Sequence, residues 1–150
     1  MVTDKLIIGR VDKADFPQLH LENIDIKIDT GAYTSSIHCH HIKETSVDGE
    51  PRIEFQLFDP SHAEYNNKTF SVKEYEKKTV KNSFGQTEDR YVFKTVITLF
   101  DRTYPIDLSL SERSEMKYPV LIGRKLLNRR FLVNTARKFI SHKLKQKNLD

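Results

Sequence analysis

Short segments in which apolar and polar residues alternate recur along most of this chain. They lie at residues 6–11, 24–29, 52–58, 69–80, 91–100 and 104–110. A period of two places neighbouring side chains on opposite faces, as in a half-buried strand. A helical pattern is confined to residues 124–130, which follow Gly123. Many short strands at close spacing predict an all-β, barrel-like fold with one short helix near the C-terminal end.

The remaining sequence gives no sign of a second domain. A chain of 150 residues with 37% hydrophobic residues can bury one compact core. It has no internal repeat, linker or low-complexity stretch, so we expect a single domain over residues 1–150. Turn residues, such as Asp48-Gly49, separate the predicted strands. The segment 131–142 predicts two short strands around a turn, and residues 143–150 resemble a frayed terminus.

Composition indicates a cytoplasmic protein. The chain has no run of about 18 apolar residues, and residues 1–10 lack the pattern of a signal peptide. Its single cysteine, Cys39, cannot form an internal disulfide, in agreement with a reducing compartment. We therefore expect no membrane contact.

The charge balance is basic and uneven. The net charge is +4, and much of the excess lies late in the chain. The late basic residues are Arg124, Lys125, Arg129, Arg130, Arg137, Lys138, Lys143, Lys145 and Lys147. A basic surface attracts nucleic acid, anionic lipid or an acidic peptide, and it also serves simply as a solvated face. Because neither zinc-finger spacing nor an RNA-binding aromatic signature is present, we expect no nucleic-acid partner.

The alternation in IDIKIDTGAYTSSIH, residues 24–38, stops at a carboxylate, Asp29, followed by Thr30 and Gly31. Gly31 removes steric bulk, so that another backbone can approach closely. A carboxylate placed beside a second one shares a proton with it, and the pair can act as acid and base at once. The same tripeptide is also compatible with a local turn that has no catalytic role.

Four possible metal ligands adjoin one another in the segment HCHH, residues 38–41. On a strand, neighbouring side chains point to opposite faces, so at most two of the four could share one ion. Further ligands could come only from His20, His62 and His142. We favour a partly buried or surface cluster over a zinc site and expect no metal.

A second motif raises the specificity of the first. The stretch YPVLIGRKLL, residues 118–127, combines an apolar run, a glycine and a short helix. In this order, IDTGA and VLIGRKLL resemble the retropepsin-like aspartic peptidases, in which the apolar-apolar-Gly segment supports the catalytic loop. Residues 7–38, 80–92 and 108–127 are similar to the bacterial branch that carries the name ATP-dependent zinc protease. The resemblance spans about residues 5–133 and implies a retropepsin-like closed β-barrel. The chain has neither His-Glu-x-x-His nor a phosphate-binding Gly-rich loop, so we expect no cofactor.

The resemblance assigns roles to individual residues. It matches Asp29, Thr30 and Gly31 to the catalytic triplet, and Gly123 and Arg124 to the supporting motif. The substrate-binding residues that it implies are Ala32, Ser35, Ser36, Asn82, Ser83, Gly85, Glu88, Arg90 and Arg113.

Two differences from the family bear on these assignments. Residue 33 is Tyr, where this branch often has Lys. The segment between the two motifs is longer than in retroviral enzymes. Residues 81–90 are therefore compatible with the mobile flap of retropepsins and with an ordinary surface hairpin.

A single Asp-Thr-Gly in the chain implies that the second carboxylate comes from another molecule. The simplest arrangement is a two-fold homodimer with Asp29 of each copy at the axis. A water between the carboxylates would then attack a peptide bond without a metal or a covalent intermediate. Similarity to proteins found alongside ATP-grasp glutamate ligases suggests an acidic peptide or protein substrate. The alternatives are a catalytically silent peptide-binding module and a regulatory partner of a ligase.

Overall fold

The computed structural model describes residues 5–58, 60, 62–81, 84–112 and 117–149. Strands dominate the chain, and its internal contacts define two compact units. The first unit comprises Met1–Ser35, Thr95–Ile106 and Tyr118–Asp150, and the second comprises Ser36–Lys94 and Asp107–Lys117. Neither unit is one continuous segment of the chain.

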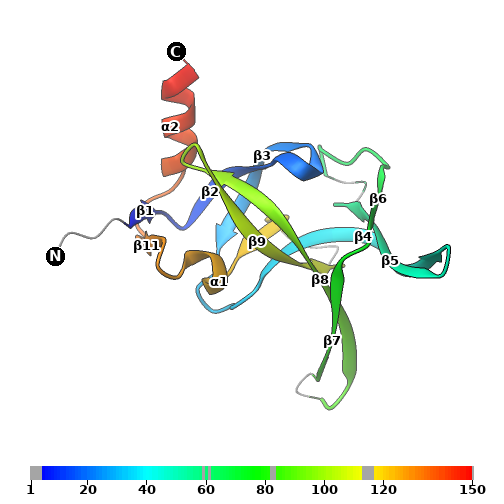
Figure 1. Ribbon diagram of the computed structural model, residues 1–150. Coiled ribbons are helices and arrows are strands. Elements are labelled where there is room, and N and C mark those ends of the chain that lie inside the picture. Colours follow the sequence, from blue (N-terminus) through cyan, green and yellow to red (C-terminus); the bar gives the residue numbers. More distant parts are fainter. Residues whose placement is uncertain (1–4, 59, 61, 82–83, 113–116, 150) are drawn as a thin grey trace. The chain divides into compact units, whose positions relative to one another are not determined.

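Figure 1 shows the elements in chain order. The strands are β1 (Leu6–Ile8), β2 (Val11–Phe16), β3 (Leu21–Ile28), β4 (Ser35–Val47), β5 (Glu50–Leu57), β6 (Thr69–Val72), β7 (Tyr75–Lys81), β8 (Thr87–Leu99), β9 (Arg102–Ser111), β10 (Val120–Ile122) and β11 (Phe131–Val133). The helices are the 3-10 turn η1 (Pro17–Leu19), α1 (Arg124–Leu127) and α2 (Ile140–Leu149). No helix in these described ranges has the length and hydrophobicity needed to cross a membrane.

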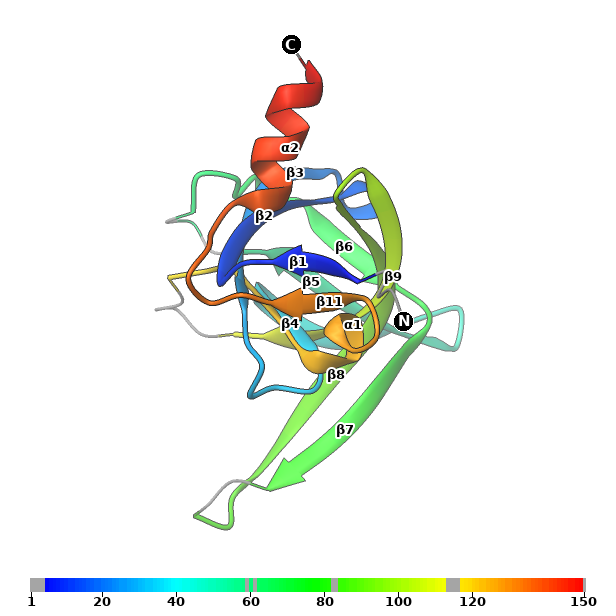
Figure 2. The same ribbon diagram turned by 90° about the vertical axis from the view of Figure 1, so that its left-hand side faces the viewer.

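In the first unit, β3 is paired on both sides. It runs antiparallel to β2 and parallel to β10, where Ile122 pairs with Ile28. The isoleucines of β3, Ile24, Ile26 and Ile28, are buried while polar residues alternate with them. Strands β1 and β11 form a separate parallel pair, and Figure 2 shows them side by side. This arrangement holds the end of β3, where the Asp-Thr-Gly triplet begins, against backbone on both sides.

The second unit contains two hairpins. Strands β4 and β5 pair antiparallel around Asp48 and Gly49, which both have positive φ, at 54° and 81°. This is the backbone that a two-residue Asp-Gly turn requires, so the predicted turn is confirmed. Strand β5 continues to β6, and the buried Phe55 contacts Phe70 and Phe93. The second hairpin joins β7 to β8 as a long two-stranded ribbon (Figure 1).

The mostly-β prediction is confirmed, with differences in element bounds. The predicted strand at residues 6–11 is two strands, because the chain turns at Gly9. A Cβ at Gly9 would lie 2.2 Å from the backbone oxygen of Arg137, so only glycine admits this close approach. The predicted helix at residues 124–130 is shorter and ends at Leu127.

The prediction for the C-terminal segment is half right. Residues 131–133 form β11, but the second predicted strand and the predicted frayed end are wrong, because Ile140–Leu149 is the helix α2. The buried carboxylate of Asp12 accepts hydrogen bonds from the backbone N–H groups of Ser141 (2.9 Å) and His142 (3.0 Å). These bonds cap the first turn of α2 beside β2 (Figures 1 and 2). The cap comes from a residue far away in sequence, so no local pattern announces the helix.

Candidate active site

Asp29 stands directly after β3 in the first unit. Its backbone N–H donates to the oxygen of Ile122 (2.8 Å), and the preceding Ile28 N–H donates to the oxygen of Arg10 (2.9 Å). The residue is therefore fixed between β10 and the corner that joins β1 to β2. Its side chain is half-buried, and Thr30 and Gly31 beyond it are exposed. The fold thus presents a firmly held carboxylate at a loop open to solvent.

The triplet closes into a tight turn around that carboxylate. The Gly31 N–H donates to Asp29 Oδ1 (3.1 Å), and the Ala32 N–H donates to the Asp29 backbone oxygen (3.2 Å). A Cβ at Gly31 would lie 3.3 Å from Asp29 Oδ1, tighter than most real contacts. One carboxylate oxygen is thus oriented by the backbone. This is the local turn that the sequence allowed as a non-catalytic interpretation, and it is equally suited to orienting a catalytic acid.

Gly123 supports the loop by close backbone contact. A Cβ at Gly123 would lie 2.5 Å from the backbone oxygen of Tyr33 and 2.9 Å from the carbonyl carbon of Thr34. The Gly123 N–H donates to Ser35 Oγ (3.0 Å), and Ser35 is buried. The structure therefore gives the Ser35 hydroxyl a supporting contact under the loop.

The helix α1 continues this support. The N–H groups of Arg124 and Lys125 donate to the oxygens of Ala32 and Tyr33, both at 2.9 Å. The Arg124 guanidinium reaches the oxygen of Thr30 (2.9 Å) and lies over the Tyr33 ring, 5.8 Å from its centroid. The two motifs found in the sequence are thus in direct contact. The packing of Tyr33 on Arg124 was not foreseen, since the sequence marked Tyr33 only as a departure from the family pattern.

The other sequence-predicted residues belong to the second unit. Ser36 is half-buried in β4, whereas Gly85, Glu88 and Arg90 are exposed at the β7–β8 hairpin. Gly85 has a φ of 81°, as a tight turn requires. The Arg90 and Glu88 side chains form an exposed ion pair of 3.7 Å. The predictions for Asn82, Ser83 and Arg113 fall outside the described residues.

A polar cluster that the sequence did not reveal ties the β7–β8 hairpin to β4. The Glu44 carboxylate accepts hydrogen bonds from Tyr75 Oη (2.8 Å), Lys77 Nζ (3.0 Å) and Tyr91 Oη (3.1 Å). These hydrogen bonds, with that from Tyr75 the strongest influence, lower the pKa of Glu44. The same contact is the main cause that raises the pKa of Tyr75. Cross-strand contacts between residues so far apart in sequence leave no local pattern.

The histidine segment divides between interior and surface. His38 and Cys39 are buried, and the His38 Nδ1 lies 3.1 Å from the Ser111 oxygen, so that nitrogen carries the proton. Burial raises the pKa of the Cys39 thiol, with a smaller contribution from Glu112. His40 Nδ1 lies 3.5 Å from a Glu112 oxygen. Among the described residues, no group of three or more His, Cys, Asp or Glu side chains is arranged to hold a metal ion.

A family model matches most of the chain, including both motifs. A model of the RimB-like family, described as retropepsin-like aspartic endopeptidase RimB, matches residues 7–144. The chain belongs to this family. The RimB-like fold is therefore retropepsin-like, and the resemblance drawn from Asp29 and Gly123 is confirmed.

Curated relatives of this RimB-like chain carry a different name. Probable alpha-L-glutamate ligases of Shewanella pealeana and Desulfotalea psychrophila are each 32% identical to it, over 93% and 88% of its length. The matching regions make up only 30% and 28% of those proteins, so the chain spans less than a third of the relatives it matches. A crystal structure of a Legionella pneumophila protein of unknown function superposes with a TM-score of 0.70 and 27% identity. That match covers 91% of this chain and 98% of the Legionella chain.

Proposed function

We propose that this protein is an aspartic peptidase whose active site forms when two copies bring their Asp29 carboxylates together. The observation that carries the proposal is the turn in which the Gly31 N–H orients Asp29 Oδ1, backed by Gly123 and α1. Because the turn alone is compatible with both interpretations, the contact of the triplet with Gly123 and α1 is what favours the catalytic one. The family to which the chain belongs supports the same chemistry.

The reaction requires one shared proton and one water. The ionised carboxylate of one copy removes a proton from a water held between the two acids, and the water oxygen attacks the peptide carbonyl. The protonated Asp29 of the other copy donates to the carbonyl oxygen. The Asp29 that took the proton from water then gives it to the amide nitrogen, while the other Asp29 takes the proton of one hydroxyl of the tetrahedral carbon. The C–N bond breaks, the amine and the carboxylic acid leave, and each Asp29 regains the charge that it held at the start.

Exposed apolar side chains in the first unit suit an interface between copies. Tyr33, beside the triplet, is 54% exposed. Ile7 and Leu132 are register partners across β1 and β11, and each is 44% exposed. Partners in a parallel pair point to the same side, so these two form an adjoining apolar surface. Covering it in a dimer would remove these side chains from water.

The substrate class in this proposal is a glutamate-rich peptide or protein. The relatives are named as glutamate ligases, whose name implies a glutamate-containing product, and the late part of this chain is strongly basic. We assign substrate contact to the hairpin residues Gly85, Glu88 and Arg90 as part of the same proposal. We also place the protein in the cytoplasm, where such ligases would act.

The test is digestion of a peptide library with the native protein and with Asp29→Asn. Asparagine keeps the size of the side chain and cannot share the proton, so cleavage should fall by several orders of magnitude. The mass by sedimentation should stay that of a dimer. Equal cleavage by both proteins would exclude Asp29 as the catalytic group.

A second experiment tests the dimer directly. Leu132→Asp places a charge on the exposed apolar pair and should shift the protein to a monomer without peptidase activity. Leu149→Asp is the matched control, because Leu149 is 78% exposed at the far end of α2. A native protein that sediments as a monomer at micromolar concentration yet cleaves peptides would contradict the shared site.

One observation favours a second candidate function. The chain corresponds to less than a third of relatives named as ligases, so the same fold occurs inside larger proteins of another activity. A silent peptide-binding or regulatory module would suit that setting. Such a module would bind glutamate-rich peptides equally well with Asp29→Asn and would cleave none.

A further inference from the structure

We propose that a basic hollow at the start of α2 is a second binding site, which holds an acidic stretch of the substrate away from the cleaved bond. The hollow has a volume of about 340 Å³ and is lined by Ala136, Arg137, Lys138, Ile140 and Lys143. It belongs to the first unit, as Asp29 does. The inference rests on the proposed function for the identity of the ligand, an acidic peptide.

The hollow lies in the most basic part of the chain. Between Glu115 and Asp150 the sequence contains no Asp or Glu. In the described part of the chain, the side chains of Arg137, Lys138 and Lys143 have no carboxylate within ion-pair distance. All three are exposed. Their charge is therefore available to a ligand.

The acids that could neutralise this surface are engaged elsewhere. The Asp12 carboxylate is fully buried and accepts the N–H groups of Ser141 and His142. Asp15 forms an ion pair of 2.8 Å with Lys145. The first turn of α2 is thus already capped, and no carboxylate of the described residues pairs with the cations around the hollow.

The segment that carries the cations is rigidly anchored. The backbone oxygen of Arg137 accepts the Arg10 N–H (2.8 Å), and the Phe139 N–H donates to the oxygen of Val11 (2.9 Å). Gly9 passes so close beneath that even a methyl group would strike the Arg137 backbone. A preorganised backbone reduces the ordering cost of binding.

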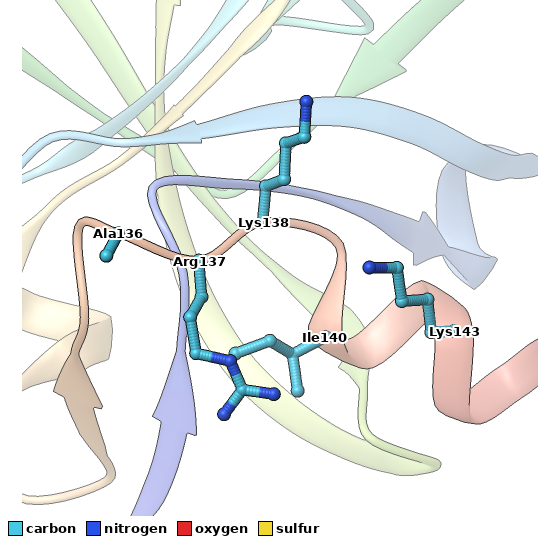
Figure 3. A pocket seen from close by; sticks show the side chains of 5 residues that line it. All are labelled: Ala136, Arg137, Lys138, Ile140 and Lys143. Atoms are coloured by element: carbon cyan, nitrogen blue, oxygen red, sulfur yellow. The ribbon is translucent and has the colours of Figure 1, made fainter.

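The arrangement of the side chains favours an extended ligand over a compact one. Figure 3 shows Arg137 and Lys138 leaving the segment in opposite directions, while Lys143 points back from α2 toward the hollow. A single phosphate would meet all three cations only if they converged. Successive carboxylates on an extended peptide are spread along its length, which suits cations that point in different directions.

Backbone hydrogen bonds place the hollow within reach of Asp29. Arg137 is bonded to Arg10, Arg10 is bonded to Ile28, and Asp29 follows Ile28. Two such steps of about 5 Å and one step along the chain of about 3.8 Å put the two Cα atoms at most about 15 Å apart. An extended peptide spans that distance in roughly four to five residues. A glutamate-rich tail cleaved at Asp29 would therefore have to extend about that far to reach the cations.

The test compares binding by two charge-matched triple variants on the Asp29→Asn background, which prevents cleavage. One is Arg137→Gln/Lys138→Gln/Lys143→Gln. The control is Lys68→Gln/Arg102→Gln/Lys147→Gln, which removes the same charges from other exposed positions. Fluorescence anisotropy with labelled oligoglutamates of two, four and eight residues measures affinity. Inorganic phosphate and a single-stranded oligonucleotide serve as competing probes.

We expect the first variant to lose roughly tenfold in affinity for the eight-residue peptide at low salt, since exposed ion pairs contribute modestly and three are removed. The two-residue peptide should be unaffected, and the control should change affinity less than twofold. In the cleavage-competent protein, the same three substitutions should raise KM for long acidic peptides without changing kcat. Thermal unfolding should stay unchanged, because all three residues are exposed.

Three results would overturn the inference. The first is an equal loss of affinity in the control variant, and the second is no loss of affinity for the eight-residue peptide. The third is oligonucleotide binding that depends on these three cations while oligoglutamate binding does not. If the native protein cleaves no peptide, the proposed peptidase fails on that result alone. The anisotropy comparison still decides whether the hollow binds acidic chains.

Discussion

The support of the catalytic loop by Gly123 can be tested by adding one methyl group. In Gly123→Ala, the new Cβ would lie 2.5 Å from the Tyr33 oxygen and 2.8 Å from the Tyr33 carbonyl carbon. These are backbone atoms, so no side-chain rotation relieves the contact. Ordinary contact begins at 3.4 Å, and the loop and β10 must therefore separate by about 0.9 Å.

The size of the effect follows from what that separation disturbs. Overpacking of this kind costs about 1–3 kcal/mol. The bonds from Arg124 N–H to Ala32 and from Gly123 N–H to Ser35 lengthen with it, and each contributes about 1 kcal/mol. A total of about 2–4 kcal/mol corresponds to a fall in Tm of roughly 5–15 °C for a chain of this size.

Displacement of the loop should also reduce catalysis in the protein that remains folded. A shift of about 1 Å at a reacting group can lower the rate by about a hundredfold. We expect kcat, measured well below Tm on a short neutral peptide, to fall by that order. The measurement of Tm requires no activity, so it tests the packing argument even if the proposed peptidase function is wrong.

Gly49→Ala is the matched control. Gly49 has a positive φ of 81°, whereas Gly123 has a φ of −96°, and nothing lies within 4 Å of a Cβ added at Gly49. The Gly49→Ala variant should lose only about 1 kcal/mol of unfolding free energy, from backbone strain, and should keep the native kcat. If Gly123→Ala unfolds at the native Tm, or if its Tm falls no further than that of Gly49→Ala, the close-approach argument is refuted.

Three further predictions follow from buried and paired groups. Asp12→Asn replaces an oxygen that accepts backbone N–H groups by a donor, so Tm should fall by roughly 5–10 °C, with loss of helical circular dichroism from α2. The pKa of Tyr75 is raised mainly by its hydrogen bond to Glu44, whereas the pKa of Tyr91 is raised mainly by burial. In Glu44→Gln, an ultraviolet titration should therefore show a larger fall in the pKa of Tyr75 than in the pKa of Tyr91. The stability that these phenols add is present below their unfolded pKa and is lost as pH rises through the raised folded-state pKa values. Denaturant unfolding at alkaline pH should detect this loss in the native protein and a smaller loss in Glu44→Gln. Because burial raises the pKa of Cys39, iodoacetamide should label it at neutral pH only after unfolding, and labelling of the native protein at the rate of a free thiol would contradict its burial.

The sequence predicted most strands of this fold, but not β4, whose burial pattern does not alternate regularly, and it predicted one helix poorly. Strands such as β3 and β5 carry their burial pattern locally, since alternate side chains face the interior. Helix α2 depends on Asp12, and its own residues, ISHKLKQKNL, give no apolar stripe. Such a helix is stabilised by tertiary contacts, and its local sequence then reads as an exposed end.

The sequence predicted the site residues that lie in the two motifs, which the structure brings into contact. Asp29 and Gly123 were identified because both lie in short patterns with a structural requirement for glycine. The bond from Gly123 to Ser35 and the packing of Tyr33 on Arg124 depend on how two distant segments meet, so no local pattern indicates them. The Glu44 cluster spans three strands and was invisible for the same reason.

One backbone path connects the features that the sequence presented separately. The Asp-Thr-Gly loop follows Ile28, Ile28 is bonded to Arg10, and Arg10 is bonded to Arg137 in the basic segment. Backbone hydrogen bonds between fixed segments leave little freedom for the acid and the cations to move apart. A substrate that engages both would therefore be positioned by the fold itself, and cleavage would occur at a set distance from its acidic end. The prediction that separates this arrangement from simple charge attraction is the length at which affinity rises, because attraction alone increases smoothly with each added glutamate.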